Sequence, residues 1–182
     1  MLFNVLQWHS SAIRALGRAK SMAQDITEYI KHTLEEAILN IKRARDGGAK
    51  IGAFILASCF IEYMAGFVCG GKTKPKDYKD CVRRYLPSYN PSRLYKHLRC
   101  KLVHNYSEGG SHWLLEGKPQ LHGQRINGLT IINLENFIQD LEKALQELLG
   151  EIESDPSKKQ KAINRYNSIG LFCVAGLVPK KK

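Results

Sequence analysis

An apolar run from Ile51 to Val68 restricts the folds open to this chain more than any other segment. It is 18 residues long and contains one charged side chain, Glu62. That length reaches the lower limit for a membrane-spanning helix, but a carboxylate in mid-span costs roughly 2.5–3.5 kcal/mol, and the other helical segments are amphipathic. We therefore expect no membrane insertion, but the central helix of a soluble bundle. Glu62 is expected at the rim of the core, and Gly52 and Gly66 are expected to permit close helix contacts.

Three further segments show the three- and four-residue apolar spacing of amphipathic helices. The first extends from about Met22 to Arg45, and the last, from Leu134 to about Glu153, follows the capping residue Asn133. Between them, Asn90 and a proline at the first helical position open a helix from Pro91 to about Asn105. Together with the apolar run, these segments predict an all-α fold, an up-and-down bundle of four main helices with short connections.

Residues 107–132 interrupt the helical pattern with glycine- and proline-containing turn signals. Two stretches, His112 to Glu116 and Leu129 to Ile132, have the character of short strands. We therefore expect a small β-hairpin or an ordered loop, inserted after the helix that ends near residue 105. The single histidines of this insertion, His112 and His122, are expected to be polar surface residues.

The predicted helical domain covers residues 22–153. Residues 1–21 are expected to be a leader or an N-terminal extension, because they contain basic and no acidic residues, as transit peptides and short amphipathic helices do. Residues 154–182 are expected to form a short basic helix, near Lys158 to Asn167, followed by an apolar tail.

Positive charge is concentrated in one part of the chain. The net charge is +11, and residues 71–106 alone carry ten Lys or Arg and two Asp. A patch of this kind favours a polyanion such as nucleic acid, or an acidic partner. The alternative is a solvated, lysine-rich loop.

Metal and disulfide chemistry find no support in the sequence. None of the five cysteines forms a C-x-x-C pair, so they indicate neither a zinc site nor a disulfide framework. Reduced thiols favour the cytoplasm. We expect neither a metal ion nor a cofactor.

The basic segment ends in the run Arg99-Cys100-Lys101-Leu102-Val103-His104-Asn105-Tyr106. Arg99 supplies a permanent cation suited to phosphate, and His104 supplies a side chain that exchanges protons near neutral pH. Such a pair is the minimum needed to cleave RNA without a metal, since one residue stabilises the charge on the phosphate while the other moves a proton. The residues expected to bind or orient the RNA beside them are Lys96, Lys101, Asn105 and Tyr106.

In a regular α-helix, the two catalytic candidates would not lie on the same face. Five residues correspond to about 500° of rotation, so Arg99 and His104 would lie about 140° apart around the helix axis. Either the helix ends or distorts after Val103, or two chains pair about a two-fold axis so that both motifs converge on one cleft. We favour the homodimer.

The run from Arg99 to Tyr106, late in a helix of an all-helical domain, resembles the signature of the HEPN superfamily, an arginine followed after four to six residues by a histidine. Tyr106 also matches the Arg-x4-His-x-Tyr variant of HEPN toxins paired with nucleotidyltransferase antitoxins. The resemblance covers roughly residues 22–153. It implies a small helical bundle with a metal-independent endoribonuclease site at a homodimer interface, in which Arg99 and His104 are catalytic. It also implies a nucleotidyltransferase-type antitoxin as partner, which can nucleotidylate the tyrosine.

Three hypotheses remain open from the sequence. The first is an endoribonuclease of single-stranded RNA, a toxin or a defence effector. The second is a non-catalytic RNA- or nucleotide-binding module that uses the basic residues 72–101 and binds without His104. The third is a protein-interaction module. A Walker A loop is excluded, because Gly70-Gly71-Lys72-Thr73 lacks the initial glycine and follows a helix where a strand is required.

Overall fold

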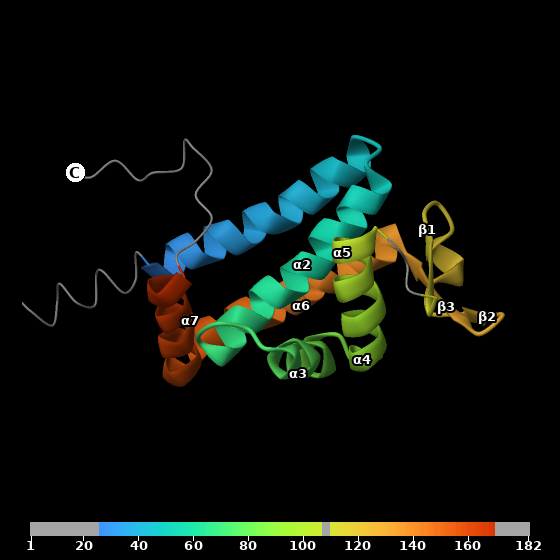
Figure 1. The fold of residues 1–182 in the computed structure, drawn as a ribbon. Coiled ribbons are helices and arrows are strands. Elements are labelled where there is room, and N and C mark those ends of the chain that lie inside the picture. Colours follow the sequence, from blue (N-terminus) through green and yellow to red (C-terminus); the bar gives the residue numbers. More distant parts are fainter. Residues whose placement is uncertain (1–25, 107–109, 170–182) are drawn as a thin grey trace, which may run out of the picture.

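The computed structural model describes residues 26–106 and 110–169. Helices make up most of it, and a small three-stranded sheet lies at one end (Figure 1). The expectation of a mainly helical protein with a small insertion after residue 106 is confirmed. The expected leader, residues 1–21, and the apolar tail beyond residue 169 lie outside the described ranges.

The long helices pack around α2 (Lys50–Cys69), which is the expected central helix. The first helix, residues 26–46, precedes it and runs alongside it in the opposite direction (Figure 1). Four later helical segments contact α2 as well: α3 (Pro75–Tyr85), the segment η1 (Leu94–Leu102), α6 (Leu134–Ser154) and α7 (Pro156–Ile169). The sheet and α7 lie at opposite ends of the helical body (Figure 1).

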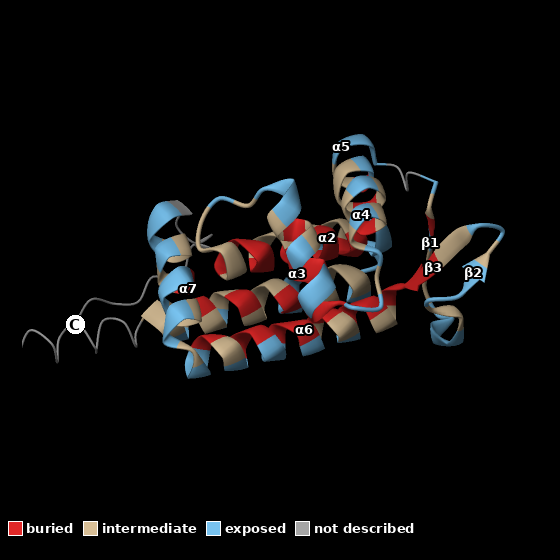
Figure 2. Ribbon diagram, turned by 90° about the horizontal axis from the view of Figure 1, so that it is seen from below, coloured by how far each residue is buried: buried red, intermediate tan, exposed pale blue. Residues whose placement is uncertain are grey.

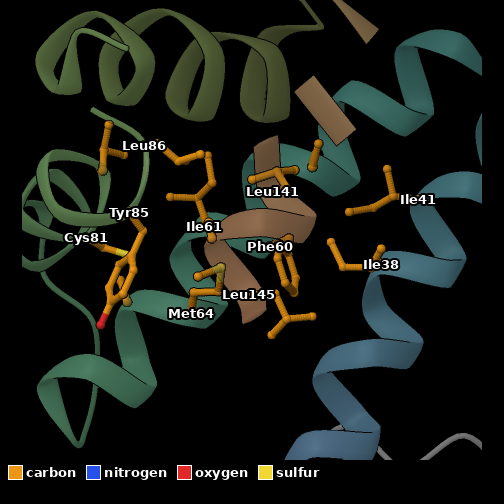
Figure 3. Packing of buried hydrophobic residues seen from close by; sticks show 14 of the residues in the cluster. Ile38, Ile41, Phe60, Ile61, Met64, Cys81, Tyr85, Leu86, Leu141 and Leu145 are labelled. Atoms are coloured by element: carbon orange, nitrogen blue, oxygen red, sulfur yellow. The ribbon is translucent and has the colours of Figure 1, made fainter. Parts of the chain in front are cut away.

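The hydrophobic core lies between these helices, whose inward faces are buried (Figure 2). Figure 3 shows how four helices contribute to it: Ile38 and Ile41 from the first helix, Phe60, Ile61 and Met64 from α2, Cys81 and Tyr85 from α3, and Leu141 and Leu145 from α6. Within the described residues, α2 alone is long and apolar enough to cross a membrane, yet more than half of its most apolar stretch is buried inside the protein. This burial agrees with a core helix of a soluble protein.

Small residues let α7 approach the C-terminal half of α2. A Cβ atom at Gly66 would lie 2.5 Å from Nε of Arg165, so the expected close contact at this glycine is confirmed. At Gly52 the expectation is wrong, since a Cβ there would meet only the Cβ of Ala49 among the described residues. The helix ends at Gly70, whose φ of 80° is readily adopted only by glycine.

The insertion contains the strands β1 (His112–Leu115), β2 (Arg125–Ile126) and β3 (Leu129–Asn133), in the order β1-β3-β2. Both expected strands are present, but they pair in parallel. The hairpin is formed instead by β3 and the two-residue β2. The turn between them is Asn127-Gly128, and both residues have positive φ, as tight hairpin turns require.

The expectation of two exposed histidines in the insertion is wrong: His112 is buried, and the side chain of His122 is 17% exposed. Only 4% of His112 is exposed. Burial, followed by the neighbouring charges of His97 and Arg93, lowers the pKa of His112 to about 4. His112 is therefore a buried, neutral side chain within reach of the charges of His97 and Arg93.

His122 anchors the sheet to the helical body. Its Nδ1 accepts a hydrogen bond of 3.0 Å from the backbone N–H of Asn133, so its proton is on Nε2. Nε2 lies 3.0 Å from the hydroxyl of Tyr89, which in turn donates to Asp140 on α6 over 2.8 Å. These bonds use both ring nitrogens of His122 and give it a structural role.

Candidate functional site

The motif lies on a helix with an unusual backbone. Asn90 caps its start, since the side-chain oxygen accepts a 2.9 Å hydrogen bond from the N–H of Arg93. After one turn, α4 (Pro91–Arg93), the backbone becomes a π-helix, η1 (Leu94–Leu102), and a final turn, α5 (Val103–Asn105), follows. The predicted extent of this helix is confirmed. π-helical segments are rare and occur frequently at functional sites.

The π-helix changes the relation between the two catalytic candidates. Its hydrogen bonds join residues five apart, so residues at this spacing come closer to a common face than in an α-helix. The interval from Arg99 to His104 is π-helical as far as Leu102. The angular separation is therefore smaller than a regular α-helix gives. The expected distortion is present, but it comes before Val103 instead of after it.

Arg99 is held by a carboxylate from the central helix. Its Nε donates a hydrogen bond to Oε2 of Glu62, and the two side chains are 19% and 35% exposed, respectively. Burial of the guanidinium opposes its charge, but the hydrogen bond and negative charge of Glu62 outweigh burial and raise the pKa of Arg99. Glu62 lies at the rim of the core, as expected, and serves there as the partner of a cation.

Arg99 and Glu62 line an open cleft of about 820 Å³. Two further cations also line it, Lys72 from the segment between α2 and α3, and Arg165 from α7. The described lining of the cleft thus has three basic side chains and one carboxylate. An excess of positive charge in a concave site favours an anionic ligand such as phosphate.

Among the described residues, the remaining wall of the cleft offers no activated nucleophile. Burial is the main reason that the pKa of the Cys59 thiol is raised and that of the Tyr63 hydroxyl is raised to about 12. Both groups are therefore protonated at neutral pH. The cleft is suited to binding and charge stabilisation rather than to covalent catalysis.

The other residues predicted from the motif lie outside this cleft. His104 is exposed in α5, and Tyr106, with a φ of 52°, ends the helix and is 68% exposed. Lys96, Lys101 and Asn105 are exposed as well. The described part of one chain therefore places Arg99, but not His104, in the cleft.

Sequence reasoning missed two basic residues of the cleft as site residues. Lys72 belongs to the basic segment, but nothing in the local pattern distinguishes it from its neighbouring lysines. Arg165 is 66 residues from Arg99 along the chain and reaches the cleft only because α7 packs on α2. The one available signal was Gly66, the small residue over which the Arg165 guanidinium lies.

Comparisons with known proteins identify no relative of this chain. No protein-family model, no curated protein and no solved structure matches this chain. Within residues 26–106 and 110–169, no group of three or more His, Cys, Asp or Glu side chains is arranged to hold a metal ion. The functional argument therefore rests on the cleft and the motif helix.

Proposed function

We propose that this protein is a metal-independent endoribonuclease of single-stranded RNA, whose site forms between two copies of the chain. The observation that carries the proposal is the position of the two motif residues. Arg99 lies in a cationic cleft, whereas His104 is exposed two residues beyond the end of the same π-helix. A two-fold partner can bring its own His104 to the cleft of the first chain.

In the proposed reaction, the RNA 2′-oxygen attacks the adjacent phosphorus and the bond from phosphorus to the 5′-oxygen breaks. His104 accepts the proton of the 2′-hydroxyl and later returns it to water. Arg99 stabilises the extra negative charge on the phosphate oxygens. The leaving 5′-oxygen takes a proton from water, so the products are a 2′,3′-cyclic phosphate and a 5′-hydroxyl.

The resemblance to HEPN proteins supplies the finer features of this proposal. They are an up-and-down arrangement of four main helices, a cytoplasmic location, and a role as a toxin or defence effector. A nucleotidyltransferase-type antitoxin is the proposed partner, and Tyr106 is its proposed target. The exposure of this tyrosine, 68%, supports its access to a second protein.

Cleavage of labelled single-stranded RNA in EDTA tests the activity. We expect His104→Ala and Arg99→Ala to reduce the rate at least about 100-fold, while His32→Ala, an exposed histidine on the first helix, leaves it unchanged. Arg99→Lys keeps a charge for Glu62 and serves as a second variant should removal of the cation disturb folding. Equal cleavage by the parent chain and the folded His104→Ala variant would contradict the proposal.

A second candidate function is a non-catalytic RNA- or nucleotide-binding module. The ion pair between Arg99 and Glu62 favours this second function. An arginine that is neutralised by a carboxylate can have a structural role, and its presence in the motif then does not require catalysis. This alternative predicts salt-sensitive RNA binding, no cleavage, and no effect of His104→Ala on the dissociation constant.

A further inference from the structure

Lys72 and Arg165 line the cleft beside Arg99, although they come from segments remote from the motif. We infer that these two side chains form a phosphate subsite, which holds a second backbone phosphate of the RNA while Arg99 engages the phosphate that reacts. This inference rests on the proposed function, since it names how the same cleft holds its substrate.

The guanidinium of Arg165 is fixed in place before any ligand arrives. It lies over Gly66, where a Cβ would be 2.5 Å from Nε and 3.0 Å from Nη2. Its Nη1 donates a 2.8 Å hydrogen bond to the carbonyl oxygen of Gly71. A guanidinium has five donors in a rigid fork, so this contact leaves donors for a phosphate oxygen at a small entropic cost.

The charge of this pair is not neutralised within the described residues. The ion pairs found there include neither Lys72 nor Arg165. Glu62, the carboxylate of the cleft, is paired with Arg99. The sequence outside the described ranges contains two acidic side chains, Asp25 and Glu108. Two unneutralised cations beside a cleft attract a multiply charged anion.

The cleft is also large enough for more than one phosphate. Its volume of about 820 Å³ falls within the range of roughly 300–1,000 Å³ in which small-molecule sites lie. Thr73 and Ser168 line it together with the cations. Their hydroxyls donate to the backbone carbonyls of Glu62 and Arg165, so either hydroxyl must exchange this bond to donate to a phosphate oxygen. A nucleotide unit with its flanking phosphates therefore fits the size and the chemistry of the site.

The test compares Lys72→Gln/Arg165→Gln with a control that removes the same charge elsewhere, Lys118→Gln/Arg125→Gln. Both control residues are exposed in the insertion. The probes are a fluorescent 12-nucleotide single-stranded RNA and fluorescent ATP, each titrated by anisotropy from 50 to 300 mM salt. Lys72→Gln alone and Arg165→Lys are included in case the double variant loses the contact between α7 and α2.

We expect the cleft variant to bind RNA about tenfold more weakly than the parent chain. The slope of log K against log salt should fall by about 0.7, the value for one phosphate contact on a single strand. The control should keep the parent slope. If the cleft variant loses affinity for RNA alone, the ligand of the subsite is a phosphate of the RNA backbone. If it loses affinity for ATP to a similar extent, the subsite also binds the phosphates of a free nucleotide.

Equal affinities and slopes for the folded cleft variant and the control would overturn the subsite. So would a parent chain that binds neither probe. Cleavage in EDTA reads out the proposed function separately. The parent chain could cut RNA in a manner that depends on Arg99 and His104 while the cleft variant binds RNA normally. This result would reject the subsite and leave the proposed function intact.

Discussion

The guanidinium of Arg99 on the π-helix and the carboxylate of Glu62 on α2 form an ion pair at the mouth of the cleft. The cation that we propose for phosphate stabilisation is thus already neutralised in the structure without ligand. Glu62 occupies the Nε donor of Arg99, so a phosphate must bind the other donors of the guanidinium beside a negative charge. The pair therefore holds Arg99 in position and weakens its attraction for RNA.

Replacement of Glu62 by Gln should tighten RNA binding several-fold, about 1 kcal/mol, because it frees Arg99 and removes a repulsive charge. The free energy of unfolding should fall by no more than about 1 kcal/mol, since both side chains are partly exposed to solvent. Anisotropy titration and urea unfolding measure the two effects. Glu116→Gln, which breaks the ion pair with Lys50 at the start of α2, is the matched control. Weaker RNA binding by Glu62→Gln would show instead that the carboxylate is needed to position Arg99.

Two glycines of α2 should respond differently to alanine. Gly52→Ala should stabilise the protein by about 0.5–1 kcal/mol, because its Cβ meets only a 3.5 Å contact with Ala49. Gly66→Ala should lack this gain and should weaken RNA binding, because its Cβ displaces the Arg165 guanidinium. Urea unfolding and RNA titration of both variants test this contrast. Equal stabilisation by the two substitutions, with unchanged RNA affinity, would contradict the close contact between α7 and α2.

His112 should make the stability fall on mild acidification. Its pKa is about 4 in the folded protein and about 6.5 in an unfolded chain. Between these values the unfolded state binds more protons, so the free energy of unfolding decreases as the pH falls from about 6.5 to 4. The loss is of the order of 3 kcal/mol.

Urea unfolding at several pH values measures this loss. In the His112→Phe variant, we expect the free energy of unfolding to change less between about pH 6.5 and 4 than in the parent chain. This expectation holds whatever the effect of the substitution on stability at pH 7. His32→Ala, on an exposed histidine, should leave the slope unchanged. A parent curve that is flat between pH 7 and pH 4 would contradict the buried, neutral state of His112.

Helix positions followed from the sequence because apolar spacing and capping residues act locally. The π-helical backbone at the motif could not be predicted from the sequence in this way. Leu94, Leu98 and Leu102 are four residues apart and all buried, a spacing that also predicts an ordinary α-helix. A change to π-helical hydrogen bonding depends on packing against α2 and α3, which the spacing does not show.

The composition of the site was predictable only in part. Arg99 was identified from its motif, whereas Glu62 was expected only at the rim of the core and not as the partner of Arg99. The approach of Arg165 depends on a contact between segments about 100 residues apart, for which Gly66 was the sole hint. The burial of His112 was missed as well, because it depends on the tertiary position of β1, which pairs with β3, and not on the local sequence.

Subunit complementation tests the central claim most directly. Arg99→Ala and His104→Ala are mixed in equal amounts, allowed to exchange subunits, and assayed on labelled RNA in EDTA. Each variant alone should be inactive. Half of all dimers in the mixture then contain one chain of each variant, and each of these carries one intact site of two. The mixture should therefore recover about one quarter of the parent activity. A mixture that stays as inactive as its components, with exchange verified by two affinity tags, would contradict a site shared between two copies of the chain.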